Sequence, residues 1–276
     1  MDTVIVAIGL LALLGVAGAL LLYFTSRRWG VADDPRVDSV TDELPGANCG
    51  GCGYKGCRDF AKACVDSVDS TGGIASLQCP VGGRPTMEAV ADILGVSASA
   101  TVRRVAVLRC AGTCSVRKEI AHYDGPRSCA VETNTGAGTL SCPFGCLGCG
   151  DCVDVCTFGG IYIDQATGIA AVDPDVCTAC GACVKACPRN LLSITDVKPQ
   201  ALVACSNTEK GAVARAECSA ACIACTKCVR VCPEGAMSMG DNVAVCDASK
   251  CTACGKCVEG CPTGAISLIF VNGTKA

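Results

Sequence analysis

The chain is poor in aromatic residues, in histidine and in clustered positive charge. Its 276 residues include one histidine, one tryptophan and 4% aromatic residues, and the formal net charge is −3. So few aromatic side chains predict thin apolar cores, and the lack of a basic cluster argues against a nucleic-acid surface. The sequence also shows no nucleophile–base pair, phosphate-binding loop or dinucleotide-binding fingerprint. We therefore expect no bond-making catalysis by this chain and no nucleic-acid partner.

Cysteine is the abundant residue, with 28 copies in the chain. That content is typical of a disulfide scaffold or of metal sites. Most of the thiols follow the spacing Cys-x2-Cys-x2-Cys-x3-Cys, which occurs four times. The four runs are Cys146, Cys149, Cys152, Cys156; Cys177, Cys180, Cys183, Cys187; Cys222, Cys225, Cys228, Cys232; and Cys251, Cys254, Cys257, Cys261. This spacing is the ligand pattern of bacterial [4Fe–4S] ferredoxins.

Two other interpretations of the cysteines remain open. Disulfides pair only two sulfurs each and need an oxidising compartment, whereas structural zinc sites use two Cys-x2-Cys pairs, often with histidine. Triplets at two-residue intervals favour cubane clusters over both, with a zinc-binding scaffold as the weaker alternative. Clusters imply a reducing compartment, and their binding free energy would replace part of the missing apolar core.

In a two-cluster ferredoxin, each run gives three ligands to one cluster and its fourth cysteine to the other. This rule predicts two tandem two-cluster domains, residues 142–200 and 218–276, in an α+β fold with a helix after each run. The predicted ligand sets are Cys146, Cys149, Cys152 with Cys187; Cys177, Cys180, Cys183 with Cys156; Cys222, Cys225, Cys228 with Cys261; and Cys251, Cys254, Cys257 with Cys232. The expected hairpins and closing strands are residues 161–172 and 191–195 in the first domain, and 236–245 and 265–270 in the second.

The amino-terminal segment, residues 1–28, is predicted to be a membrane anchor. Val4 to Phe24 is an uncharged apolar run, long enough as a helix to cross a hydrocarbon core of roughly 30 Å. In the alternative, a cleaved signal peptide, positive charge precedes a shorter apolar stretch, whereas here Arg27 and Arg28 follow it. The positive-inside rule then predicts a single-pass protein of the plasma (inner) membrane, with its cysteine-rich part in the cytoplasm.

A small module is predicted between the anchor and the ferredoxin-like domains. Residues 29–43 are acidic, have no apolar periodicity and are predicted to be a linker. Residues 44–98 follow as a module for one cluster. Its predicted ligands are Cys49, Cys52, Cys57 and Cys79. Cys64 shares a helical face with Phe60 and Val68, so we expect it to be a buried thiol that binds no metal.

Most of the remaining cysteines lie in, or directly after, two lead-in segments, residues 99–141 and 201–217. A further cluster is predicted on four of them. These are Cys110, Cys114, Cys129 and Cys142. An internal repeat relates Cys110 to Cys205, each after a strand-like run, and Cys142 to Cys218, each four residues before a cysteine run. Cys205 and Cys218 receive no assignment, and buried free thiols remain the alternative for the whole group.

Two other residues of ligand type are expected not to bind metal. Cys246 lies at the end of a predicted strand, where a thiol serves as a small apolar side chain. His122 is the single histidine, and a solvent-facing or hydrogen-bonded role is expected for it. The sequence therefore predicts five [4Fe–4S] clusters, and six with the lead-in group.

The order of these parts resembles the B subunit of the Rnf complex, an ion-translocating ferredoxin:NAD oxidoreductase. The resemblance begins with the membrane helix, the acidic segment and residues 48–57, NCGGCGYKGC, with a distant Cys79-Pro80. It continues through residues 109–110, 142–148, 204–211 and 218–223. The chain departs from the family pattern in having Cys149 where many members have leucine, and Thr157 where they have proline.

The resemblance implies an electron-transfer subunit that accepts electrons from soluble ferredoxin. It would relay them to other subunits, including flavin-bearing ones, of a membrane complex that moves Na⁺ or H⁺. The residues alone predict only an anchored electron conduit, because such clusters accept and pass single electrons. An iron–sulfur subunit of another membrane oxidoreductase, of hydrogenase type or an electron donor to nitrogenase, is the alternative.

Overall fold

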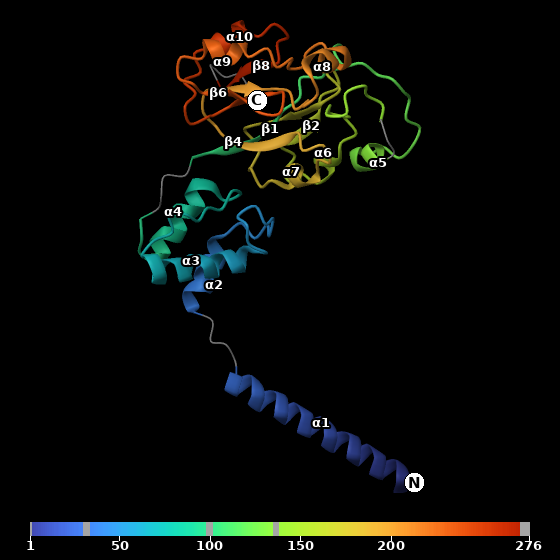
Figure 1. The fold of residues 1–276 in the computed structure, drawn as a ribbon. Coiled ribbons are helices and arrows are strands. Elements are labelled where there is room, and N and C mark those ends of the chain that lie inside the picture. Colours follow the sequence, from blue (N-terminus) through green and yellow to red (C-terminus); the bar gives the residue numbers. More distant parts are fainter. Residues whose placement is uncertain (1, 30–33, 98–101, 135–137, 271–276) are drawn as a thin grey trace.

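A computed structural model describes residues 2–29, 34–97, 102–134 and 138–270 of the chain (Figure 1). Its helices are α1 (Asp2–Trp29), α2 (Pro35–Glu43), α3 (Cys57–Thr71), α4 (Gly83–Leu94), α5 (Cys129–Asn134), α6 (Asp151–Asp154), α7 (Ala182–Ala186), α8 (Gly211–Glu217), α9 (Lys227–Val231) and α10 (Lys256–Glu259). Its strands are β1 (Arg104–Leu108), β2 (Ile161–Ile163), β3 (Ala170–Val172), β4 (Leu192–Asp196), β5 (Gln200–Val203), β6 (Met237–Met239), β7 (Ala244–Cys246) and β8 (Ile266–Ile269). This mixed content confirms the predicted α+β class.

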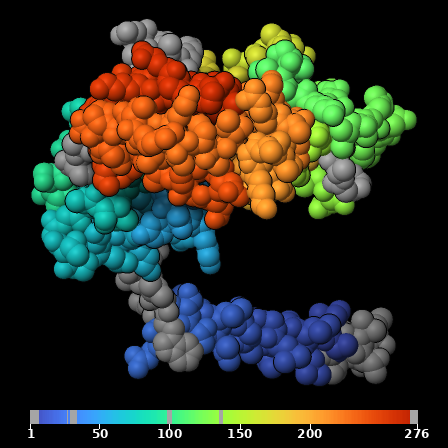
Figure 2. Space-filling model, turned by 45° about the horizontal axis from the view of Figure 1, so that its top comes forward, coloured from blue at the N-terminus to red at the C-terminus, as the bar shows by residue number. Residues whose placement is uncertain are grey.

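The first helix, α1, is long and apolar enough to cross a membrane. Its span Ala7–Ser26 has 20 residues and a mean hydropathy of 2.4, and none of it is buried against the rest of the protein. Figure 2 shows α1 lying outside the body formed by the later parts of the chain. Lipid would cover the apolar surface that the protein leaves open, so α1 fits the predicted anchor.

The structure corrects the predicted linker for residues 35–43, which form α2. The helix begins after Asp34, whose carboxylate accepts a hydrogen bond from the backbone N–H of Arg36. Val37 and Val40 are buried against α3 and α4. Two valines three positions apart are enough to attach a short helix whose other side chains are mostly polar, yet they are too few to give a clear period in the sequence.

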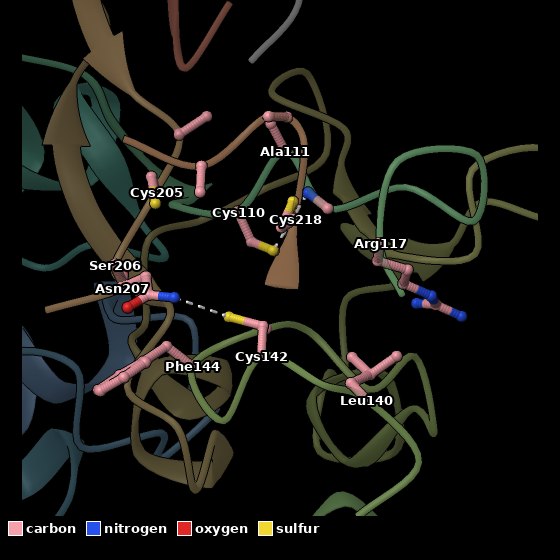
Figure 3. A pocket seen from close by; sticks show the side chains of 15 residues that line it. Cys110, Ala111, Arg117, Leu140, Cys142, Phe144, Cys205, Ser206, Asn207 and Cys218 are labelled. Carbon is pink, nitrogen blue, oxygen red and sulfur yellow. Dashed lines mark hydrogen bonds between the residues drawn. The ribbon is translucent and has the colours of Figure 1, made fainter. Parts of the chain in front are cut away.

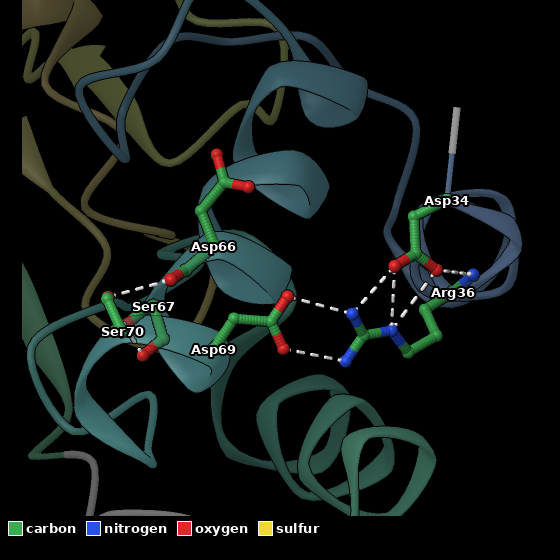
Figure 4. A network of polar contacts seen from close by, with 6 residues as sticks. All are labelled: Asp34, Arg36, Asp66, Ser67, Asp69 and Ser70. Carbon is green, nitrogen blue, oxygen red and sulfur yellow. Dashed lines mark hydrogen bonds and ion pairs between the residues drawn. The ribbon is translucent and has the colours of Figure 1, made fainter. Parts of the chain in front are cut away.

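An ion-pair network fastens α2 to α3 (Figure 4). Arg36 binds Asp34 at the start of α2, and its Nη1 and Nη2 lie 3.0 and 2.8 Å from the two carboxylate oxygens of Asp69 on α3. Such a two-point contact between arginine and a carboxylate fixes orientation as well as distance. The charged side of α2 therefore also helps to hold the helix in place.

Helices α2, α3 and α4 share an apolar core of their own, and we call residues 34–97 the first module. Phe60, Cys64 and Val90 are almost completely buried in this core, as the helical spacing predicted for Cys64. Both α3 and α4 end at a glycine in the left-handed conformation, Gly72 (φ 75°) and Gly95 (φ 68°), which is the commonest way to close a helix.

Two units with the same topology follow the module. In each, a lead-in strand pairs antiparallel with the closing strand, β1 with β4 and β5 with β8. A hairpin, β2–β3 or β6–β7, packs beside this pair. The predicted hairpins and closing strands are thus confirmed. The strands β1 and β5 lie outside the predicted domain limits, so we define the first unit as residues 102–197 and the second unit as residues 200–270.

The core of each unit is small and contains cysteines. The first includes Cys152 and Cys183 beside Leu191, and the second includes Cys228 and Cys257 with a few aliphatic side chains. Cysteine at the centre of such a core is expected where a bound cluster completes the packing.

Candidate metal centres

The four cysteine runs share one backbone conformation around their second cysteine. In every run the residue before it and the residue after it are left-handed. These residues are Gly148 and Gly150 (φ 74° and 105°), Ala179 and Gly181 (56° and 78°), Ala224 and Thr226 (53° and 59°), and Ala253 and Gly255 (56° and 80°). Left-handed residues in a loop turn backbone N–H groups inward and make a concave site for an anionic group such as an iron–sulfur cluster. Alanine and threonine rarely adopt this conformation, so the loop shape follows from the site and not from residue preference.

The third cysteine of each run lies in a short helix that begins inside the run, and not after it as the spacing suggested. Cys152, Cys183, Cys228 and Cys257 occupy this position in α6, α7, α9 and α10, and all four are buried. Three thiols of each run are therefore presented by one turn of loop and the first turn of a helix.

Backbone N–H groups from neighbouring elements point at several of these sulfurs. Four such bonds, of 3.3–3.4 Å, join Ala106 N to Cys177 Sγ, Ala201 N to Cys251 Sγ, Leu191 N to Cys187 Sγ, and Ala236 N to Cys232 Sγ. N–H donors stabilise thiolates and tune the reduction potential of a cluster. Two of the donors lie in β1 and β5, so the lead-in strands form part of the sites.

Three cavities coincide with three of the predicted ligand sets. The first is lined by Cys156, Cys177, Cys180 and Cys183, which bound a space of about 350 Å³. The second is lined by Cys232, Cys251, Cys254 and Cys257, with a space of about 330 Å³. The third is lined by Cys49, Cys52, Cys57 and Cys79, with a space of about 320 Å³. In the first two, the fourth thiol comes from the other run of the same unit, which is the exchange that the spacing predicts. By their lining residues, the three sites lie one in the first module, one in the first unit and one in the second unit; Figure 1 shows the arrangement of these three parts of the chain.

Three thiols of each remaining predicted set lie in or against the core of their unit: Cys146, Cys152 and Cys187 in the first unit, and Cys222, Cys228 and Cys261 in the second. Burial, together with the charges of Cys146, Cys129 and Cys187, raises the pKa of Cys152 to about 12. Burial likewise raises the pKa of Cys228, which lies near other thiols of its set. Because a thiol ligates iron as the thiolate, loading these sites must release protons.

The loop that begins at Cys146 has a fifth thiol beside it. Cys129, at the start of α5, is a direct neighbour of Cys149. The thiol of Cys149 donates to Glu132 Oε2 at 3.3 Å, and burial and this buried carboxylate raise its pKa. The carboxylate of Asp151 holds α5 there by accepting the backbone N–H of Cys129 at 2.7 Å. Two thiols are therefore available for one position of this set.

The predicted extra cluster on Cys110, Cys114, Cys129 and Cys142 is corrected by the structure, which separates these four residues. Cys114 is exposed and lies against Gly168, while Cys129 belongs to the surroundings of the Cys146 loop. Only Cys110 and Cys142 line a common cavity.

The other thiols of that cavity are Cys205 and Cys218 (Figure 3). Sequence reasoning left these two unassigned. The internal repeat was the signal that could have found them, because it pairs Cys110 with Cys205 and Cys142 with Cys218.

Of the residues expected not to bind metal, Cys64 and His122 have the expected surroundings, whereas Cys246 lies beside the predicted ligand Cys251. Cys64 is buried in the helical core, and burial raises its pKa to about 12. Cys246 ends β7 and is only half-buried, and burial with the neighbouring Cys251 raises its pKa to about 12. His122 is exposed.

The first module touches the first unit through its cysteine loop. A Cβ atom at Gly51 would lie 2.9 Å from both the Cα and the carbonyl oxygen of Cys180, so no larger residue fits without movement. The loops that carry Cys52 and Cys180 are therefore in backbone contact. Two predicted cluster sites thus adjoin each other across this junction.

Among the residues that the structure describes, no three cysteine, histidine or acidic side chains converge closely enough to hold a single metal ion. The four thiolates of a cubane bind four different irons, so they stand further apart than ligands of one ion. This finding therefore concerns single ions and does not bear on clusters.

Family models match the module and both units. One described as "4Fe-4S dicluster domain" matches residues 145–191 and 221–265, and another with that description matches residues 176–237. A model described as "Putative Fe-S cluster" matches residues 44–69. These matches confirm several [4Fe–4S] clusters as the cofactors.

Three similar proteins align with most of the chain. The B subunit of the Na(+)-translocating ferredoxin:NAD(+) oxidoreductase complex of Acetobacterium woodii is 39% identical over 80% of this chain, which spans 65% of that protein's length. The B subunit of the proton-translocating ferredoxin:NAD(+) oxidoreductase complex of Clostridium ljungdahlii is 37% identical over 90% of this chain and 86% of its own length. The B subunit of the ion-translocating oxidoreductase complex of Methanosarcina acetivorans is 35% identical over 77% and 78%. The chain therefore belongs to the family of B subunits of the Rnf complexes, the ion-translocating ferredoxin:NAD oxidoreductases.

Proposed function

We propose that this chain takes electrons from soluble ferredoxin at the cytoplasmic face of the membrane. It relays them through [4Fe–4S] clusters toward flavin-bearing subunits of its complex. The names of two relatives include ferredoxin, NAD(+) and a translocated ion. These names support the assignment. The proposed ligands are the first-module set and the four exchanged sets of the two units.

The observation that carries the proposal is the repeated loop conformation. Alanine or threonine is left-handed in three of the four runs, which costs of order 1 kcal/mol or more per residue and persists only where the surroundings enforce it. Two of these three loops, those around Cys180 and Cys254, line cavities of similar size, each with four thiols. A cluster supplies single-electron chemistry at such a site; the protein positions the thiolates, donates N–H groups to their sulfurs and excludes water.

The contact at Gly51 supports a path for electrons between the first module and the first unit. The first-module loop touches the backbone of Cys180, so electrons that enter at the module can pass to the first unit without a gap in the protein. Long-range relay needs such closely placed sites because the chain has no mobile carrier of its own.

The anchor supports a cytoplasmic position for the cysteine-rich part. Arg27 and Arg28 follow the apolar span directly, and positive charge favours the cytoplasmic side. Protease added to inverted membrane vesicles should cleave the cysteine-rich part. Cleavage in right-side-out vesicles alone would show the opposite orientation.

The test of the cluster function is elemental analysis of the full chain purified without oxygen. We expect a brown protein with about four irons and four sulfides per site. Cys180→Ser should lose about four irons per chain because Cys180 lies in the cavity of its set. Cys64→Ser, a buried thiol outside every cavity set, is the matched control and should lose none. A colourless, iron-free protein, or equal iron in both variants, would contradict the proposal.

The test of the electron donor is reduction by ferredoxin. Reduced ferredoxin should bleach the visible absorption of the anaerobic protein within seconds, whereas reduced NAD alone should not. Bleaching by a chemical reductant but not by ferredoxin would point to another membrane oxidoreductase.

A further inference from the structure

A fourth cysteine-lined cavity lies between the two units. The space between its lining residues, including the part open to solvent, is about 400 Å³, close to the 320–350 Å³ of the three cavities that match predicted ligand sets. Four cysteines line it: Cys110, Cys142, Cys205 and Cys218. Figure 3 shows the sulfurs of Cys110, Cys142 and Cys218 directed into the space between these residues, with Cys205 at its side. The ferredoxin spacing assigns none of the four thiols; one 4Fe-4S dicluster model spans Cys205 and Cys218, and none covers Cys110 or Cys142.

Each unit contributes two of the four thiols from equivalent positions. Cys110 follows β1 and Cys205 follows β5, in each case two residues after the strand. Cys142 and Cys218 both precede the first cysteine of a run by four residues and are both buried, at 8% and 9% exposure. The repeat therefore brings two pairs of cysteines to one place, which independent buried thiols would have no reason to do.

The same hydrogen bond forms in both halves of the site. Cys110 Sγ accepts the backbone N–H of Cys146 at 3.4 Å, and Cys205 Sγ accepts that of Cys222 at 3.3 Å. These are the N–H···S bonds seen in the proposed cluster sets, where they stabilise thiolates. Cys146 and Cys222 are themselves proposed ligands, one in each unit.

The wall of the cavity suits a buried anionic group. Asn207 is 1% exposed, and its Nδ2 lies 3.4 Å from Cys142 Sγ and 2.7 Å from Glu217 Oε2. Gly112 N donates to Cys110 Sγ at 3.4 Å. A buried amide that donates a hydrogen bond to sulfur stabilises the negative charge of a thiolate. Apolar side chains, Leu140, Phe144 and Ala221 among them, complete the lining and limit the access of water.

We propose that Cys110, Cys142, Cys205 and Cys218 bind a further [4Fe–4S] cluster that connects the two units. The inference rests on the proposed function, since it requires that the other sets carry clusters. The connection is direct, because two of the four sulfurs accept hydrogen bonds from ligand residues of the flanking sets. The cluster takes one electron from a reduced neighbour on one side and returns to its oxidised state on giving that electron to the other side. No additional oxidant or reductant is consumed.

The first test is the iron content of the double variant C205A/C218A in the full chain, purified without oxygen. The parent should contain about 24 irons, and the variant about four fewer. Cys114→Ser, an exposed thiol of the same lead-in segment, is the matched control and should keep all of the iron.

The outcome of Cys180→Ser in the same experiment separates this inference from the proposed function. If Cys180→Ser loses about four irons and C205A/C218A loses none, the connecting cluster is refuted and the other clusters stand. If the parent itself lacks iron, both proposals fail.

A second variant covers the case in which C205A/C218A does not fold. Asn207→Leu keeps all four thiols but removes the donor to Cys142 Sγ. We expect its iron content to equal that of the parent, while the reduction potential of one paramagnetic signal falls, because a donor to sulfur favours the more negative reduced state. Potentials identical to those of the parent for every signal would overturn the proposal.

Discussion

The first module and the two units solve the same packing problem in different ways. The module has a helical core that includes Phe60, Val65, Met87 and Val90, and Cys79 is its one buried predicted ligand. In the units the clusters of buried residues are smaller, and cysteines, Cys152 and Cys183 or Cys228 and Cys257 among them, are part of each cluster. The module therefore has enough apolar contact to form part of its structure by itself, whereas the units depend on metal to complete their interior. Low aromatic content affects the two regions unequally for this reason.

Removal of iron should have the largest effect and should act on the two regions differently. Anaerobic chelation is expected to unfold most of both units, because metal-binding free energy is folding free energy where the core is made of ligands. Helices α3 and α4 should persist. Hydrogen exchange read by mass spectrometry would show fast exchange in residues 104–269 and retained protection at residues 60–70 and 87–94. Loss of protection in both regions together would show that the module also depends on its cluster.

The loop that begins at Cys146 allows a sharper test of how iron binding depends on single thiols, because Cys129 lies beside Cys149 as an additional thiol. Cys129→Ser and Cys149→Ser should each keep nearly all of the iron, since either thiol can occupy the shared position. The double variant should lose about four irons per chain. The measurement is iron per chain beside Cys180→Ser, whose set has no spare thiol in its cavity. A full loss in Cys149→Ser alone would show that Cys129 cannot substitute.

Gly51 tests the junction between the two regions. Gly51→Ala places a methyl group 2.9 Å from the backbone of Cys180, which forces the two loops apart by a few tenths of an ångström or more. We expect unchanged iron content and a modestly slower transfer of electrons from module to unit, since transfer falls with distance. Stopped-flow reduction of the anaerobic protein measures this rate. Gly73→Ala, whose Cβ would meet no atom within 4 Å, is the control and should leave the rate unchanged.

Cys64 should give the smallest effect, a change in pH dependence. Burial raises its pKa to about 12, above the ordinary value near 9. The folded module therefore binds this proton more tightly than the unfolded chain does. The resulting stabilisation is complete below about pH 9 and is lost as the pH rises toward 12. Cys64→Ala should consequently lose less stability than the parent between pH 8.5 and 10.5, as followed by denaturant unfolding of the iron-free chain. Parallel curves for the two proteins would contradict the raised pKa.

Several features were predictable because they are local in the sequence. The spacing of the four runs predicts the loop that surrounds each cluster site. The loop and the helix turn after it together determine which neighbouring thiols can reach the same cluster. The hairpins at Ile161 and Met237 follow from short alternating segments around turns. The face shared by Phe60 and Cys64 follows from helical periodicity.

Other features were not predictable because their signal is weak or distributed. Helix α2 depends on Val37 and Val40 alone, and an acidic segment with two valines resembles a linker until α3 and α4 are in place. The position of Cys129 depends on hydrogen bonds to Asp151, 22 residues away.

By itself, the sequence determined the cofactor class and the apolar span of the anchor, and it predicted the exchange of ligands within each unit, because spacing, length and charge are properties of neighbouring residues. Only the tertiary structure decided which of the remaining thiols meet. Cys110 and Cys205 are 95 positions apart, yet they line one cavity because the segments that follow β1 and β5 meet there, where Ala111 N donates to the carbonyl oxygen of Ala204 at 2.8 Å. Such a long-range contact between the two units sets the meeting place, and no local pattern contains it.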